Sequence, residues 1–173
     1  VEAAEVSSRM GLSVALITHD VMKIGEMSCN PAIGGIGKSH LAKEVDALGG
    51  LMAKSADKAG LHYRVLNSTK GQAVRATRVQ TDRDLYKRAI QNYLNQSENL
   101  SIIEGSVIDI NIESSVAKSI VAEDGLVYSA SAIILTTGTF LGGVMHTGLT
   151  QSQGGRVGDP SSIELAQKLR GIG

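Results

Sequence analysis

The hydrophobic and polar positions at the start of the chain predict a helix followed by a buried strand. Residues 1–10 are typical of a helix that Gly11 ends, and residues 12–18 form an apolar, partly β-branched run. A helix, a glycine and an apolar strand make up the second half of a βαβ unit. We therefore expect the first strand and its glycine-rich turn to precede Val1, outside this sequence.

The stretch from residue 19 to residue 94 predicts two amphipathic helices, at 38–48 and at 81–94. A glycine-, proline- and asparagine-containing loop is expected at 19–37, a strand at 61–66 and a basic loop at 67–78. The residues expected to line one face of each helix are Leu41, Val45 and Leu48 in the first, and Leu85, Ala89, Ile90 and Leu94 in the second.

The second half of the chain has the character of β-structure. Short β-type runs occupy 100–104, 107–112, 116–122 and 126–129, with turn residues between them. The apolar residues 132–135 predict a buried strand, residues 142–159 a second glycine-rich loop, and residues 160–170 a last helix. This order predicts an α/β fold: an open parallel sheet in which a three-stranded β-meander forms one crossover.

Composition narrows the class of protein. A chain of 173 residues with 42% hydrophobic residues and a mean hydropathy of +0.04 fits one globular domain. No stretch reaches the roughly 18–20 apolar residues that span a bilayer, so we expect a cytoplasmic protein. The single cysteine, Cys29, excludes an internal disulfide, and the scattered histidines indicate no metal site.

The zero net charge hides a basic segment. Residues 38–88 contain eleven lysines and arginines against five acidic residues. Such a segment indicates either a phosphate-bearing partner or ordinary solvated helix faces. Within it, Arg75 and Arg78 are candidates for nucleic-acid contacts.

Residues 32–39, AIGGIGKS, match a relaxed P-loop pattern. A true P-loop needs an apolar strand that leads into the glycine loop, so that backbone N–H groups cradle phosphates. The preceding residues 26–31 are polar and contain Pro31, and the apolar run 132–135 ends in Thr136 rather than in an aspartate. We therefore interpret this match as fortuitous.

Other candidate site residues follow from their positions. Thr136, Thr137 and Gly138 close a buried strand with small residues, which favours either close approach of a ligand or a plain turn. His19 and Asp20 end the second strand of the βαβ unit, where dinucleotide folds often place an acidic group on a ribose. Cys29 is either an exposed, reactive thiol beside Lys38 and backbone N–H groups or an inert buried one.

The run Met27-Ser28-Cys29-Asn30-Pro31-Ala32-Ile33-Gly34-Gly35-Ile36-Gly37-Lys38 resembles the signature of the glucose-inhibited division protein A family, the tRNA uridine 5-carboxymethylaminomethyl modification enzymes. The segments 43–53, 75–78, 138–141 and 154–160 resemble the same family, so the similarity covers essentially the whole chain.

The resemblance implies an FAD-dependent flavoenzyme that modifies C5 of the wobble uridine of certain tRNAs. The family works as a homodimer with a GTPase partner, in a heterotetramer-type complex, uses NADH to reduce the flavin, and takes a one-carbon unit from a tetrahydrofolate. By position, Val107 and Ser162 match FAD contacts, Asn30, Gly34 and Gly35 belong to the signature at the cofactor, and Cys29 matches a cysteine that the chemistry requires.

The resemblance also implies that residues 1–173 are one FAD-binding domain fragment, truncated at both ends and inactive by itself. The NADH-site region, a second essential cysteine and a helical tRNA-binding end would follow Gly173. Two alternatives stay open: a folate- and FAD-dependent tRNA uridine C5 methyltransferase, and a P-loop NTPase or nucleic-acid-binding module without redox chemistry.

Overall fold

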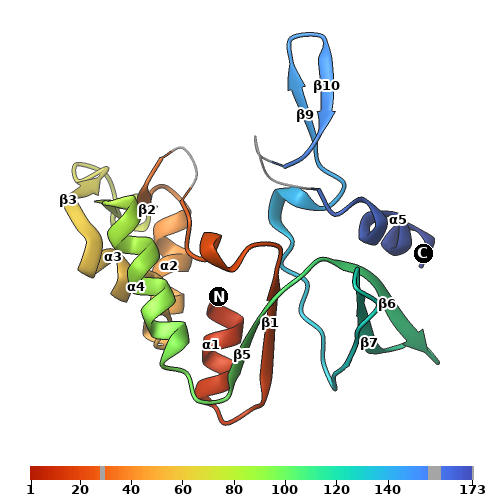
Figure 1. The fold of residues 1–173 in the computed structure, drawn as a ribbon. Helices are drawn as coiled ribbons and strands as arrows, with labels where there is room; N and C mark the ends of the chain where they lie inside the picture. The colour runs from red at the N-terminus through yellow and green to blue at the C-terminus, as the bar shows by residue number, and fades with distance from the viewer. Residues whose placement is uncertain (28–29, 156–160, 173) are drawn as a thin grey trace. The chain divides into compact units, whose positions relative to one another are not determined.

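A computed structural model describes residues 1–27, 30–155 and 161–172 and divides into two compact units. Unit 1 comprises residues 1–16 and 20–102, and unit 2 comprises residues 17–19 and 103–173. Each unit has its own sheets and helices, shown in Figure 1. The fold is mixed α/β, with one parallel strand pair and several antiparallel sheets.

Unit 1 packs helices on a three-stranded antiparallel sheet of order β2-β4-β3. Its strands are β2 (Ala32–Gly34), β3 (Gly60–Leu66) and β4 (Ala76–Thr81), and its helices are α1 (Glu2–Arg9), α2 (Lys38–Ala47), α3 (Leu51–Ala59) and α4 (Arg83–Asn95). Two short 3₁₀ turns, η1 (Val21–Lys23) and η2 (Gln72–Val74), lie in the connections. One face of the sheet and the helices form the core, whose buried residues include Ile33, Leu51, Val79, Ile90 and Leu94.

Strands β1 (Val14–Thr18) and β5 (Leu100–Glu104) form a parallel pair. The Val14 N–H donates to the Asn99 carbonyl at one end, and the Gly105 N–H donates to the Thr18 carbonyl at the other, both at 2.8–2.9 Å. The two strands therefore run in the same direction, and their carboxyl ends lie at one edge.

Unit 2 contains the predicted three-stranded meander. Strands β6 (Val107–Glu113), β7 (Val116–Ala122) and β8 (Val127–Ser129) pair antiparallel in that order. The remaining elements are η3 (Gly138–Phe140), the hairpin β9 (Val144–Thr147) and β10 (Thr150–Gln153), and α5 (Ile163–Gly171), which packs on β6. The structure thus confirms the predicted three-stranded meander and the predicted last helix.

Four predictions about single elements are wrong. Residues 132–135 are not a strand: they pair with no strand of the described chain, and Ile134 is 65% exposed. An apolar run becomes a strand only where a neighbouring edge offers hydrogen bonds. The expected loops 19–37 and 67–78 contain β2 and the start of β4, and the loop 142–159 contains the β9–β10 hairpin.

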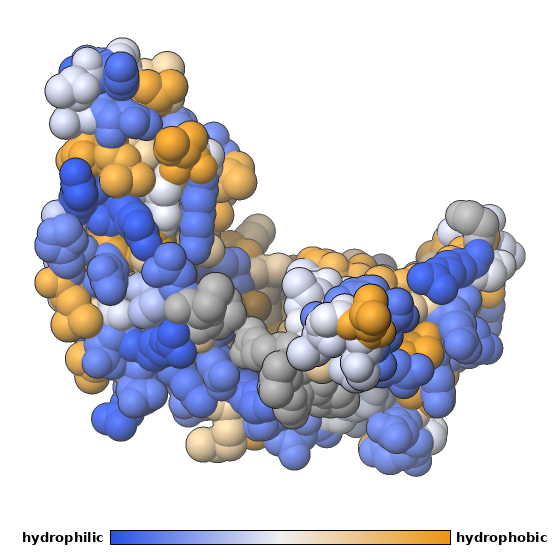
Figure 2. Space-filling view, turned by 90° about the horizontal axis from the view of Figure 1, so that it is seen from above, coloured by the Kyte–Doolittle hydropathy of each residue, from blue (hydrophilic) through white to orange (hydrophobic). Residues whose placement is uncertain are grey.

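The apolar face expected on α2 is not buried. Ser39 and Ala42 face the core, whereas Leu41 and Leu48 are exposed. In α4, Leu85 is exposed and Tyr86 takes the buried position beside Ala89. Figure 2 accordingly shows hydrophobic residues scattered among hydrophilic ones on the visible surface.

Candidate functional site

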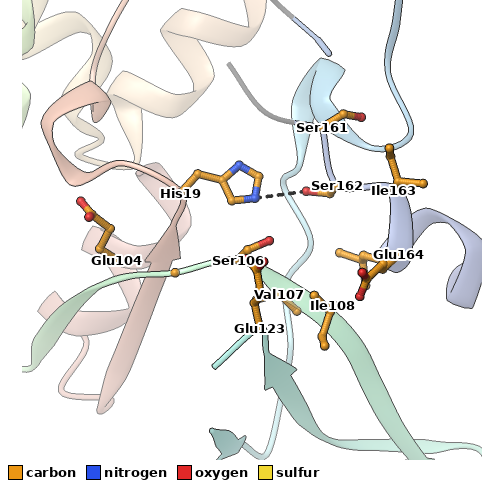
Figure 3. A pocket seen from close by; sticks show the side chains of 12 residues that line it. His19, Glu104, Ser106, Val107, Ile108, Glu123, Ser161, Ser162, Ile163 and Glu164 are labelled. Carbon is orange, nitrogen blue, oxygen red and sulfur yellow. Dashed lines mark hydrogen bonds between the residues drawn. The ribbon is translucent and has the colours of Figure 1, made fainter. Parts of the chain in front are cut away.

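A cavity of about 510 Å³ lies in unit 2, at the carboxyl ends of β1 and β5 (Figure 3). Its volume falls within the range of small-molecule sites, roughly 300–1,000 Å³. Open α/β sheets bind nucleotides at this edge, outside the carboxyl ends of parallel strands. The lining residues are His19, Glu104, Gly105, Ser106, Val107, Ile108, Glu123, Ser161, Ser162, Ile163, Glu164 and Leu165.

Backbone hydrogen bonds fix the turn that forms one wall of the cavity. The Gly105 N–H donates to the Thr18 carbonyl, and the Glu123 N–H donates to the Ser106 carbonyl, each at 2.8 Å. These bonds tie the end of β5 and the beginning of β6 to their neighbouring strands. Val107, the first residue of β6, is held at the cavity as a result.

The opposite wall is the start of α5, which a loop of unit 2 positions. The Ser162 N–H donates to the Phe140 carbonyl at 2.8 Å, and the Gly142 N–H donates to the Ser162 carbonyl at 3.1 Å. Ser161 Oγ also lies 3.0 Å from the Phe140 carbonyl oxygen, to which it donates. Ser162 is buried, and its Oγ lies 3.3 Å from Nε2 of His19. Figure 3 shows the His19 imidazole pointing toward the Ser162 side chain.

Carboxylates dominate the charge of the lining. Glu104, Glu123 and Glu164 contribute acidic side chains, and among the described residues no lysine or arginine lines the cavity. Carboxylate oxygens accept hydrogen bonds from hydroxyl and amino groups and repel phosphates. The cavity therefore suits the ribose hydroxyls and the base of a nucleotide better than its phosphates.

An ion pair joins the two elements that carry the cavity walls. Lys168 Nζ of α5 lies 2.8 Å from Asp109 Oδ2 of β6. The hydrogen bond from Lys168 lowers the pKa of the Asp109 carboxyl below its ordinary value, and the Ile110 N–H contributes to the same effect.

The cavity brings together two of the predicted cofactor residues, Val107 and Ser162, and also His19. Asp20 does not line it: the Asp20 carboxylate accepts the Met22 N–H at 2.8 Å and caps η1 in unit 1. Thr136, Thr137 and Gly138 do not line it either. Thr136 and Thr137 precede η3 and Gly138 begins it; the carbonyl of its residue Phe140 accepts hydrogen bonds from Ser161 and Ser162.

The other predicted cofactor residues, Asn30, Gly34 and Gly35, lie in unit 1. Gly34 has φ +99°, and a Cβ there would collide with the Thr77 carbonyl oxygen, so only glycine fits. The Gly35 N–H donates to Ser39 Oγ at 2.8 Å. Cys29, the predicted catalytic residue, lies outside the described residues.

The contacts of residues 32–39 differ from those of a P-loop. Residues 32–34 pair with β4, so this part of the pattern is strand rather than phosphate loop. Lys38 Nζ donates to the Ala32 carbonyl at 2.9 Å, and Ser39 Oγ donates to the Thr77 carbonyl. The lysine and the hydroxyl that a P-loop directs at phosphate and metal are used here to close the turn.

Arg75 and Arg78, the predicted nucleic-acid contacts, lie on the β3–β4 connection and on β4. Arg75 Nε donates to the Lys70 carbonyl at 3.0 Å, which shapes the loop. Arg78 Nη2 donates to Asn30 Oδ1 at 3.2 Å.

Sequence reasoning missed the acidic residues of the cavity. Glu104 and Glu123 each follow an apolar strand run, and Glu164 lies in the first turn of α5. The place of Glu104 at the end of a parallel strand was a usable signal, because ligands bind at the carboxyl ends of parallel strands. Among residues 1–27, 30–155 and 161–172, no group of three or more His, Cys, Asp or Glu side chains is arranged to hold a metal ion. No helix in those same ranges is long and apolar enough to cross a membrane.

Comparison with solved structures confirms the Rossmann-like α/β fold. GidA from Aquifex aeolicus, seen in two crystal forms, matches with a TM-score of 0.93 and 39% sequence identity. The match covers 98% of this chain and 28% of the Aquifex chain, so this chain spans 28% of the length of that relative.

More distant structures share the fold alone. The GidA-related protein from Thermus thermophilus matches with a TM-score of 0.63 at 13% identity, over 99% of this chain and 63% of its own. P. aeruginosa PqsL in complex with 2-aminobenzoylacetate matches with a TM-score of 0.52 at 14% identity, over 73% of this chain and 36% of its own.

The sequence also matches the glucose inhibited division protein A family over residues 1–173. Together with the 39% identity to Aquifex GidA over nearly the whole chain, this match shows that the protein belongs to the glucose inhibited division protein A family.

Proposed function

We propose that this chain is the FAD-binding part of a flavoenzyme that modifies tRNA. The observation that carries the proposal is the meeting of Val107 and Ser162 in one cavity at the carboxyl ends of parallel strands. These are the two positions that match FAD contacts in the family, and they come from elements far apart in the sequence. A cavity at this edge of an α/β sheet is where a dinucleotide is expected.

The residues of the cavity fit the adenosine half of FAD. Glu104, Glu123 and Glu164 offer acceptors for ribose hydroxyls or the adenine amino group, and Val107 and Ile108 offer backbone and apolar contacts. His19 and Ser162 would orient the bound group, since their side chains already contact each other. Bound FAD would supply the redox chemistry, while the protein binds, orients and shields it.

The reaction that we propose is addition of a carboxymethylaminomethyl group at C5 of the wobble uridine. NADH as reductant, a tetrahydrofolate as one-carbon donor, a GTPase partner and a homodimer belong to the same proposal. Its support is membership of the family and the Cys29 signature run. Cys29 would act beside the flavin as a nucleophile or a thiol activator, because a thiolate is the strongest nucleophile among the common side chains near neutral pH.

The proposal is tested with the full-length protein that contains this chain. Purified protein should be yellow, with about one FAD per chain, and cells that lack it should lose the modified wobble uridine from their tRNA. Nucleoside analysis by mass spectrometry distinguishes this product from C5-methyluridine. A colourless protein whose loss leaves every tRNA uridine unchanged would refute the proposal.

A further inference from the structure

The β3–β4 hairpin is an exposed basic surface without acidic residues. Its 22 residues, Gly60 to Thr81, contain four lysines and arginines and no aspartate or glutamate. Arg64, Lys70 and Arg75 are exposed, and Arg78 is partly exposed. Among the residues that the structure describes, none of these four cations forms an ion pair with a carboxylate.

The strand register places two of these cations side by side. Arg64 of β3 is directly opposite Arg78 of β4. Residues directly opposite in an antiparallel pair share a face, and like charges there destabilise the sheet. The neighbour that Arg78 does bind, Asn30 Oδ1, is a neutral amide. The sheet thus maintains an unfavourable arginine pair that nothing in the described chain neutralises.

The same face of the sheet carries further hydrogen-bonding groups. His62 and Gln80 form the next pair on that face, and both are exposed. The opposite face carries Val79 and Ile33, which pack into the core. His62, Arg64 and Gln80 are exposed and Arg78 is partly exposed, so these side chains are accessible and can donate hydrogen bonds to an anionic ligand.

We propose that this face, defined by His62, Arg64, Arg78 and Gln80, binds the phosphate backbone of the substrate RNA. The proposal rests on the proposed function and adds the place where the RNA is held. Planar guanidinium groups bind phosphates with two parallel hydrogen bonds, and two arginines at a fixed strand spacing suit a repeating chain of phosphates. An RNA partner also explains why the hairpin contains no aspartate or glutamate.

The arginine pair contacts the segment that holds the predicted cofactor residues Asn30 and Gly34. Arg78 pairs with Gly34 in the sheet and binds the side chain of Asn30. Asn30 and Gly34 belong to the signature run that contains Cys29. RNA phosphates bound at Arg64 and Arg78 would thus lie beside the segment that we expect to act on the uridine.

The test compares Arg64→Gln/Arg78→Gln with Arg88→Gln in the full-length protein. Arg88 is an exposed arginine of α4 in the same unit, and its replacement removes charge outside the hairpin. The probe is a fluorescein-labelled anticodon stem-loop RNA with an unmodified wobble uridine, and anisotropy measures its affinity at several salt concentrations. We expect the double variant to bind roughly tenfold more weakly, with a log–log salt slope smaller by about 1.4, at about 0.7 per lost phosphate contact.

The accompanying readouts separate the outcomes. Arg64→Gln should not lower the melting temperature, because it removes a like-charge pair, and Arg88→Gln should bind RNA as the unchanged protein does. Equal RNA affinity and salt slope in the double variant and the unchanged protein would overturn the inference and leave the proposed function standing. If the double variant instead lost binding to an acidic protein, the face would belong to a protein partner and the inference would also be overturned. An unchanged protein that holds flavin but binds no RNA would overturn the inference together with the RNA part of the proposed function.

Discussion

His19 Nε2 lies 3.3 Å from Ser162 Oγ, so the residue that follows β1 contacts the residue that precedes α5. Both residues line the cavity in which Val107 also lies. The contact joins two segments of unit 2 that are remote in sequence, and it makes the cavity dependent on both.

Ser162→Ala should weaken FAD binding in the full-length protein by roughly 3- to 10-fold, because one net hydrogen bond is worth about 0.5–1.5 kcal/mol. His19→Ala should have an effect of similar size. The measurement is flavin fluorescence during titration of the apoprotein. Ser129→Ala, at an exposed position of β8, is the control and should bind FAD normally. An equal loss of FAD affinity in Ser162→Ala, His19→Ala and Ser129→Ala would mean that the contact between His19 and Ser162 has no specific role.

Gly34→Ala should destabilise unit 1 by about 2–5 kcal/mol, because the new methyl group meets the Thr77 carbonyl and the backbone has φ +99°. Urea unfolding followed by circular dichroism measures the loss. Gly71→Ala is the matched control: its φ is −57° and no atom lies within 4 Å of the added carbon. We expect that variant to stay within about 0.5 kcal/mol of the unchanged protein. Similar stability for both variants would contradict the geometry of β2.

Asp109→Asn should remove a pH-dependent part of the stability. The pKa of Asp109 is lowered in the folded state by the Lys168 hydrogen bond, so the folded protein binds the proton less readily than the unfolded chain. The stabilisation is present above the ordinary value of 3.8 and is lost as the pH falls through the lower folded-state pKa. Urea midpoints of the two proteins should therefore differ most near neutral pH and converge in acid. A difference that stays constant across this range would rule out the ion pair as its cause.

Cys29→Ser should separate cofactor binding from chemistry. Cys29 lies outside the described residues, and the prediction rests on the family signature. Serine is close in volume to cysteine, so folding and flavin content should survive, whereas its hydroxyl is a far weaker nucleophile than a thiolate. We expect a yellow, dimeric protein whose flavin NADH still reduces, but which forms almost no modified uridine.

Two other results would reject a chemical role for Cys29. Normal formation of the modified uridine would show that the thiol is not needed. Loss of flavin together with activity would make the residue structural.

Local patterns in the sequence determined the elements whose stability is mostly local. The helix α4 was predictable because its apolar positions recur at helical spacing, and its N-cap is Asp82, which accepts the Leu85 N–H. The meander was predictable because apolar runs alternate with turn residues. The family was recognisable from the run around Cys29, since a motif of that length is specific by its letters alone.

Tertiary contacts decided the rest. Helix α3 has no local cap: the Glu2 carboxylate accepts the N–H groups of Leu51 and Met52 at 2.9 and 2.6 Å, from 49 and 50 residues away. The strands β2 and β4 exist because they pair with each other, and residues 132–135 are no strand because they pair with nothing described. Val107 meets Ser162, and Arg64 lies opposite Arg78, because of the strand register and the connections of the chain. Register and connections are set by the free energies of contacts between distant segments, which no local pattern encodes.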